Sequence, residues 1–167
     1  MSARADNVAI RLASAGDIPA LARVWHDAWH SSHAAIDPDV AARRPIEFFN
    51  ERIGTALPNC AAAVVDGEVI GFASWEGDSI GQVFVMPAFH GRGVAALVIR
   101  AAEDALQAEG FNRITLFCRT GNDRARAFYE KQGWEVVGEV PHDLGHMEGR
   151  KPVTVWRLEK SLGGDAK

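Results

Sequence analysis

The sequence predicts a mixed α/β protein in which one twisted sheet carries helices on both faces. Short runs of β-branched and aromatic residues alternate with longer segments whose apolar residues recur at helical spacing. Glycine and proline stand at most of the boundaries between these segments. We therefore expect the order β-α-α-β-β-β-α-β-α-β-β in a single layered architecture.

Length and charge narrow the class of protein. The chain has 167 residues and a net charge of −4, so we expect one domain over residues 1–167 with its core at about 8–159. That charge gives no general basis for binding nucleic acid or an anionic membrane. Residues 1–7 are polar and no apolar run could span a bilayer, so the expected location is the cytoplasm.

The N-terminal third predicts one strand and two helices. Asp17 and Pro19 mark the start of the first helix, with Asp17 as its acidic cap. Pro45 is expected to interrupt or kink the second helix. The predicted ranges are a strand at 8–12, a helix from 18 to about 30–33, a loop at 31–39 and a helix at 40–53.

The remaining chain predicts six strands and two helices. Asp66 and Gly67 form a hairpin turn, Gly110 ends a helix, and Asn122 caps the next one. The predicted ranges are strands at 60–65, 69–75, 80–86, 113–118, 134–140 and 153–158, helices at 93–109 and from 123 onward, and a polar loop at 141–151.

Cysteine and histidine usage predicts no metal site. Cys60 and Cys118 are too few for a disulfide framework or a metal cluster, and their apolar surroundings favour buried thiols. The histidines of the N-terminal and C-terminal thirds are scattered, without metal-ligand spacing, although some are expected to border a pocket.

A glycine loop between a strand and a helix is the strongest functional signal. Pro87 ends an apolar strand at 82–86 that we expect to be buried, and Gly91 and Gly93 precede an amphipathic helix. The free N–H groups at a helix start bind anions, and glycines let a phosphate approach closely. The same loop matches a dinucleotide fingerprint, but the acidic residue expected about twenty positions later is missing.

Two motifs in this order resemble the GNAT superfamily of acyl-CoA N-acyltransferases. The first is V-x-P-x-F-H-G-R-G-V-A, in which His90, Gly93 and Ala95 stand at the family positions Gln/Arg-x-x-Gly-x-Gly/Ala. The second, N-x-x-A-x-x-F-Y-x-x-x-G-W, runs from Asn122 to Trp134. With the order of strands, the resemblance covers about residues 8–159 and implies a mostly antiparallel sheet.

The resemblance implies a binding site for acetyl-CoA. In the family, the strands corresponding to 80–86 and 113–118 splay apart, and the pantetheine arm pairs with the first of them. Arg92, Arg124 and Arg126 are candidates to meet the outer phosphates, with a solvated surface position as the alternative for each. The residues expected to bind the cofactor are Val83, Phe84, Val85, His90, Gly91, Arg92, Gly93, Val94, Ala95, Ala96, Asn122, Arg126 and Tyr129.

The resemblance also implies catalytic roles. Tyr129, the only tyrosine, matches the position whose hydroxyl protonates the leaving thiolate of CoA. The alternative is an aromatic side chain packed in the core, with its hydroxyl bonded to a backbone group. The family often places a glutamate where this chain has Ser79, so Asp78 or Glu76 is the candidate base.

We therefore expect a cytoplasmic enzyme that transfers an acetyl or similar acyl group from acyl-CoA to a primary amine by direct attack. A small-molecule acceptor is preferred over a protein or peptide N-terminus. The alternative from another class is a non-catalytic acyl-CoA-binding module, which the missing glutamate favours and the retained Tyr129 opposes. The expected partners are acetyl-CoA and the amine, with a homodimer left open and with no metal.

Overall fold

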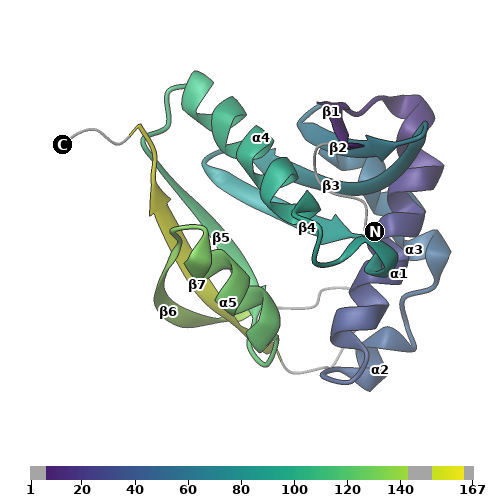
Figure 1. Ribbon diagram of the computed structural model, residues 1–167. Coiled ribbons are helices and arrows are strands. Elements are labelled where there is room, and N and C mark those ends of the chain that lie inside the picture. Colours follow the sequence, from purple (N-terminus) through teal and green to yellow (C-terminus); the bar gives the residue numbers. More distant parts are fainter. Residues whose placement is uncertain (1–6, 143–151, 164–167) are drawn as a thin grey trace.

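The computed structural model describes residues 7–142 and 152–163, and these form a seven-stranded sheet (Figure 1). The spatial order is β1-β2-β3-β4-β5-β7-β6. All neighbours run antiparallel except β4 and β5, which are parallel. The strands are β1 (Ala9–Leu12), β2 (Cys60–Val65), β3 (Glu68–Glu76), β4 (Ser79–Val85), β5 (Arg113–Arg119), β6 (Glu135–His142) and β7 (Val153–Ser161).

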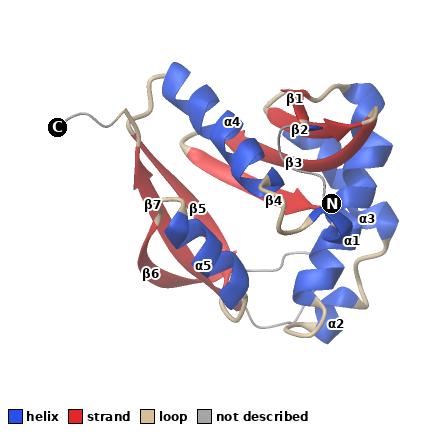
Figure 2. Ribbon diagram, in the orientation of Figure 1, coloured by secondary structure: helices blue, strands red, loops and turns tan. Residues whose placement is uncertain are grey.

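Helices cover both faces of this sheet (Figure 2). Helices α1 and α3 pack on one face, and α4 and α5 lie on the other. Short 3-10 turns occupy Ala15–Asp17, Gly54–Ala56 and Pro87–Phe89. The helices are α1 (Ile18–His33), α2 (Pro38–Ala41), α3 (Ile46–Ile53), α4 (Val94–Ala108) and α5 (Asp123–Lys131).

Strand β2 shows how the pleat separates the two halves of the core. Ala61 and Ala63 pack with the apolar face of α4, whereas Cys60 and Ala62 pack with α1 and α3. Successive side chains of a strand point to opposite faces, so a strand covered on both sides is apolar throughout. The buried thiols predicted at Cys60 and Cys118 are confirmed.

A β-bulge interrupts the pairing of β4 with β3, close to the point where β4 leaves β5. Trp75 pairs with Ile80, whereas Ala73 pairs with Val83. An interval of two residues in β3 therefore lies opposite an interval of three residues in β4. The Ser74 hydroxyl accepts the Gln82 N–H at 3.0 Å inside this irregularity. A bulge bends its strand and increases the local twist. Beyond the bulge, β4 diverges from β5 after the single pair Ser79–Thr115.

The structure confirms the predicted order of elements and adds one short helix. The segment expected as a loop at 31–39 is shorter, because α1 continues to His33 and α2 begins at Pro38. The helix expected over 40–53 is two helices. Pro45 lies in an extended conformation before α3, since a proline inside the helix would remove a hydrogen bond and clash with the preceding turn.

Two further expectations need correction. The Asp17 carboxylate does not cap α1; it accepts hydrogen bonds from the Ser14 N–H in the preceding turn and from the Arg11 guanidinium in β1. The stretch at 82–86 is fully buried only at Val85; Gln82, Val83 and Phe84 are half-buried where β4 borders a cavity, and Met86 follows the end of the strand. The polar loop expected at 141–151 lies mostly outside the described residues, and β6 extends to His142. Within the described ranges, no helix is long and apolar enough to cross a membrane.

Candidate active site

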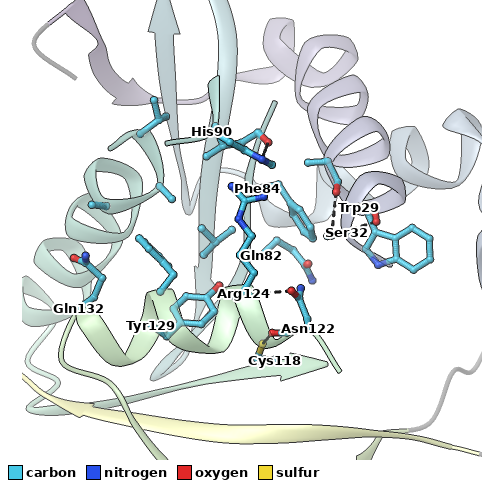
Figure 3. Close-up of a pocket in the computed structure, with 18 of the residues that line it drawn as sticks. Trp29, Ser32, Gln82, Phe84, His90, Cys118, Asn122, Arg124, Tyr129 and Gln132 are labelled. Carbon is cyan, nitrogen blue, oxygen red and sulfur yellow. Dashed lines mark hydrogen bonds between the residues drawn. The ribbon is translucent and has the colours of Figure 1, made fainter. Parts of the chain in front are cut away.

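The divergence of β4 and β5 opens a cavity of about 580 Å³ (Figure 3). Its walls come from the end of α1, the bulged part of β4, the loop before α4, the end of β5 and one face of α5. The lining residues are Ala28, Trp29, Ser32, His33, Gly81, Gln82, Val83, Phe84, Val85, Phe89, His90, Gly91, Gly93, Val94, Ala95, Ala96, Phe117, Cys118, Arg119, Asn122, Arg124, Ala125, Phe128, Tyr129 and Gln132.

The glycine loop places the start of α4 at this cavity. Gly91 and Gly93 have φ values of 79° and 82°, in the left-handed region that glycine adopts without steric cost. Gly93 is the N-cap of α4. The first N–H groups of the helix have no partner within it, and the helix dipole adds positive potential there. The loop therefore brings to the cavity a helix start, the kind of position at which proteins commonly bind anions.

His90 stabilises the loop against β4. Its Nε2 donates to the Val85 carbonyl at 3.0 Å, so the proton lies on Nε2. The pKa of His90 lies below its ordinary value. Burial is the main cause and the nearby Arg124 charge adds to it, while the hydrogen bond to Val85 acts in the opposite direction. The side chain thus bonds to the strand, and the backbone of the loop remains available to a ligand.

The three candidate arginines differ in placement. Arg124 enters the cavity from the first turn of α5 (Figure 3). Arg126 does not line it; its guanidinium lies 4.7 Å from the centre of the Trp156 ring. Arg92 also does not line the cavity, and its guanidinium lies 5.2 Å from the centre of the Phe89 ring. Of the three, the structure brings only Arg124 to the cavity.

Tyr129 lies on the cavity face of α5, beside Cys118 of β5 (Figure 3). Among the described residues, its hydroxyl has no hydrogen-bond partner, which argues against the alternative of a hydroxyl tied to the backbone. Burial raises the pKa of Tyr129 above its ordinary value, and Cys118 acts in the same direction. Burial also raises the pKa of the Cys118 thiol to about 12. Both groups therefore keep their protons at neutral pH.

Asn122 caps α5, as its position predicts. Its side-chain oxygen accepts the Ala125 N–H at 3.3 Å. A capping residue satisfies a backbone donor that the helix cannot satisfy itself. The cap fixes the first turn of α5, and with it the entry of Arg124 into the cavity.

Asp78 does not reach the cavity. It is exposed in the turn before β4, and its carbonyl accepts the Thr115 N–H at 3.0 Å, at the point where β4 and β5 are still paired. Glu76 is exposed at the end of β3 and also does not line the cavity. Among the described lining residues there is no Asp or Glu.

The α1 wall of the cavity is aromatic. The His33 ring stacks on Trp29 at 5.0 Å with an interplanar angle of 1°. Its centre lies 6.5 Å from that of Phe84 in β4. Burial lowers the pKa of His33 to about 4. The imidazole is therefore uncharged at neutral pH.

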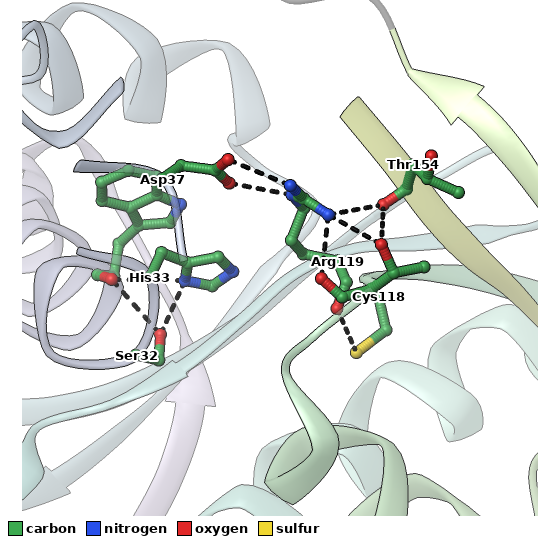
Figure 4. A network of polar contacts seen from close by, with 8 residues as sticks. Ser32, His33, Asp37, Cys118, Arg119 and Thr154 are labelled. Carbon is green, nitrogen blue, oxygen red and sulfur yellow. Dashed lines mark hydrogen bonds and ion pairs between the residues drawn. The ribbon is translucent and has the colours of Figure 1, made fainter. Parts of the chain in front are cut away.

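A buried ion pair holds the two sides of the opening together (Figure 4). Arg119 at the end of β5 donates to both carboxylate oxygens of Asp37, which follows α1, at 2.8 and 3.0 Å. The same guanidinium donates to the Thr120 and Thr154 carbonyls. A two-pronged arginine–carboxylate contact fixes geometry as well as charge.

The sequence predicted only that some of the histidines border a pocket, and the structure places His33 there. Trp29 belongs to the buried apolar face of α1, and the polar Ser32 and His33 follow it in the last turn of the helix, where all three line the cavity. Arg119 and Asp37 lie 82 positions apart, so no local pattern joins them. Among the described residues, no group of three potential ligands could hold a metal ion.

Comparisons with known proteins identify the family to which this chain is similar. The model of the acetyltransferase (GNAT) family matches residues 20–134. An uncharacterised N-acetyltransferase of Mycobacterium tuberculosis is 29% identical over 115 residues, which cover 66% of this chain and 71% of that protein.

Two solved structures share the fold. A GCN5-related N-acetyltransferase from Rhodopseudomonas palustris superposes with a TM-score of 0.75 at 24% identity, covering 92% of this chain and 95% of that one. YncA from Salmonella typhimurium, solved with its cofactor acetyl-CoA, gives a TM-score of 0.65 at 20% identity, covering 96% and 97%. With a family match over more than half of its length, this chain belongs to the GNAT acetyltransferase family.

Proposed function

We propose that this acetyltransferase moves an acetyl group from acetyl-CoA to a primary amine of a small molecule, by direct attack in a ternary complex. The observation that carries the proposal is the opening between β4 and β5, with the glycine loop at one wall and Tyr129 at another. An elongated cofactor can lie along the free edge of β4 with its phosphates at the start of α4.

The backbone of β4 supports a role in holding the pantetheine arm. The Met86 N–H donates to the Ile70 carbonyl of β3. Backbone groups alternate in direction along a strand, so those of Phe84 also face β3, and those of Val83 and Val85 face the opening. The Val85 carbonyl is already bonded to His90. The Val83 groups and the Val85 N–H remain as partners for the amides of pantetheine.

The phosphates would meet backbone N–H groups at 93–96 and the guanidinium of Arg124. This assignment uses the helix start, where anions bind most favourably, and a cation that enters the same cavity. We place Arg92 and Arg126 outside this contact, because neither lines the cavity.

The transfer needs a balanced movement of protons. The amine nitrogen attacks the thioester carbon, the C–S bond breaks, and the electron pair leaves on sulfur as the CoA thiolate. The Tyr129 hydroxyl, which keeps its proton at neutral pH, donates to that thiolate and is reprotonated by solvent. The nitrogen loses one proton to solvent as the amide forms, and this balances the proton that solvent returns to Tyr129.

A small-molecule acceptor is favoured by the composition of the cavity. A basic peptide or polyamine is held best by carboxylates, and none lines the described part of the cavity. Acetylation of a peptide N-terminus is the alternative, and a non-catalytic acetyl-CoA-binding module is the alternative outside enzymes.

Release of free thiol from acetyl-CoA in the presence of an amine panel tests the proposal. The panel should include small primary amines and short peptides, and calorimetry should measure acetyl-CoA binding in parallel. We expect binding together with turnover of small amines. Turnover of peptides alone would move the assignment to the first alternative, and binding without turnover of any amine would move it to the second.

A further inference from the structure

Hydrogen bonds at the end of α1 fix the tautomer of His33. The Ser32 hydroxyl lies 3.0 and 3.3 Å from the Ala28 and Trp29 carbonyls, which can only accept, so we assign its single proton to this carbonyl pair. Ser32 Oγ also lies 2.7 Å from His33 Nδ1, and with that assignment Nδ1 is the donor. The Trp29 carbonyl, 3.2 Å from Nδ1, can again only accept. Nδ1 carries the proton, and Nε2 presents a lone pair.

Packing fixes the direction of this lone pair. The ring is stacked flat on Trp29 and lines the cavity. In Figure 4 the second ring nitrogen points away from Ser32, towards the side on which Arg119 lies. Among the described residues, Nε2 has no hydrogen-bond partner. The His33 side chain is half-buried and lines the cavity, so a ligand there can donate a hydrogen bond to Nε2.

The other candidate proton acceptors of the cavity are excluded in turn. No Asp or Glu lines its described part. The Nε2 proton of His90 is directed to Val85, beside the glycine loop, away from the α1 wall. Cys118 and Tyr129 keep their protons because burial raises the pKa of each. On the α1 wall, His33 is the group that offers a nitrogen lone pair.

We propose that His33 positions the acceptor: its Nε2 accepts a hydrogen bond from the N–H of an uncharged primary amine, next to the aromatic surface of Trp29 and Phe84. This inference rests on the proposed function and names the class of acceptor as an apolar primary amine that binds in its neutral form. The hydrogen bond leaves the nitrogen lone pair free to face the thioester carbon.

The charges around His33 are consistent with a neutral acceptor. Asp37, Arg44 and Arg119 act on the imidazole from neighbouring segments. Asp37 is engaged by both prongs of Arg119, so its negative charge is compensated. The low pKa of His33, about 4, keeps the imidazole unprotonated throughout the pH range of an ordinary assay. An ammonium ion finds no unpaired carboxylate among the described lining residues, whereas the neutral amine finds an acceptor.

Two substitutions of His33 separate the hydrogen bond from the packing. His33→Phe keeps a ring on Trp29 and removes the lone pair; His33→Gln places a carbonyl oxygen near the position of Nε2. With benzylamine as acceptor, we expect kcat/KM to fall about 10- to 100-fold in His33→Phe, mainly through KM, and to stay within about threefold in His33→Gln. The Kd for acetyl-CoA should not change in either.

His26→Phe is the matched control. His26 lies on the same helix two turns earlier, does not line the cavity and bonds to Asp27, so its kinetics should equal those of the wild type. Nitrogen NMR of labelled histidine provides a readout that does not depend on turnover: at pH 7, Nδ1 of His33 should be protonated and Nε2 bare, and benzylamine should shift the Nε2 signal.

The outcomes are distinct. An active wild type matched by His33→Phe, or a protonated Nε2, overturns the inference alone. A wild type that turns over other amines but not benzylamine overturns the acceptor class. A wild type that binds no acetyl-CoA overturns the proposed function, and the inference with it.

Discussion

One hydroxyl group distinguishes Tyr129 from the adjacent Phe128, and both rings line the cavity. The two rings pack edge-to-face at 5.4 Å, and Trp134 lies 6.5 Å from Tyr129. Packing of this kind needs the ring, not the oxygen. The Tyr129 hydroxyl has no hydrogen-bond partner among the described residues and is therefore available for the proposed proton transfer.

Tyr129→Phe tests this role. If the hydroxyl protonates the CoA thiolate, kcat should fall about 10²-fold, within the range of general acid catalysis. The Kd for acetyl-CoA should change little, because the acid acts on charge that develops in the transition state. The melting temperature should also be nearly unchanged. Steady-state kinetics, calorimetry and thermal melting on one variant suffice; full activity would reduce Tyr129 to a packing residue.

At the scale of single elements, the start of α4 combines two requirements. The chain must turn sharply after β4, which Gly91 and Gly93 allow with positive φ, and the helix start must remain open to an anion. A side chain at Gly93 would be strained as well as close to the proposed phosphate position.

Gly93→Glu should weaken acetyl-CoA binding by about 10²-fold or more, because it places a negative charge beside the phosphates. Gly67→Glu is the matched control. Gly67 has a φ of 80° in the β2–β3 turn, so it carries the same strain and charge away from the cavity. Calorimetry should show normal binding in the control. Equal Kd values in the two folded variants would contradict the pyrophosphate assignment.

The pair Asp37–Arg119 connects two elements that the sheet joins only weakly. The side chains are 7% and 19% exposed, and the contact joins the segment after α1 to the end of β5. Removing one partner of a buried pair leaves a desolvated charge.

Asp37→Asn should lower the free energy of unfolding by about 3 kcal/mol. The control is Asp104→Asn, in the exposed pair Arg100–Asp104 with side chains 76% and 65% exposed, which should change it by less than about 0.5 kcal/mol. Urea denaturation measures both. Similar values for the two variants would show that the Asp37 contact does not stabilise the opening.

At the scale of the whole molecule, the opening is stabilised by distant parts of the chain. Helix α1 supplies the aromatic wall, β4 its bulge, and β5 and α5 the opposite wall. The seven-stranded sheet is continuous through only one paired position between β4 and β5. The cavity exists only in the folded chain, so the pKa values of the side chains that line it should change on unfolding.

The pH dependence of stability provides a test. The folded pKa of His33 is about 4, against an ordinary value of 6.5. Between these values the unfolded chain binds a proton that the folded chain does not, so stability falls as the pH drops from 6.5 to 4 and is constant above that window with respect to this group. The lowered pKa of Asp17 acts only at more acidic pH, below its ordinary value of 3.8.

Urea denaturation at pH 7, 5.5 and 4.5 should therefore show a declining free energy of unfolding in the wild type and a smaller decline in His33→Gln. The substitution removes the titrating group, and the difference between the two curves should open only below pH 6.5. Parallel curves over the whole range would mean that His33 titrates alike in the folded and unfolded chains.

Much of the fold could be predicted because its signals are local. Asn122 caps α5, Gly110 follows α4 with a φ of 102°, and Asp66 and Gly67 turn the hairpin. The glycine loop and Tyr129 could be predicted to belong to a site, because they fall in contiguous motifs. Their roles in binding and catalysis remain predictions, and Arg126 and Asp78 show that a motif position or a neighbouring carboxylate does not ensure access to the cavity.

The sequence by itself determined the class of fold, the order of elements and the loop that begins α4, because capping, turn formation and side-chain periodicity act over a few residues. Only the tertiary structure decided that His33 faces the opening beside Phe84, and that Asp37 meets Arg119 across 82 positions. Such contacts depend on strand register and on where the β4 bulge bends the sheet, and these are set by the packing of the whole chain.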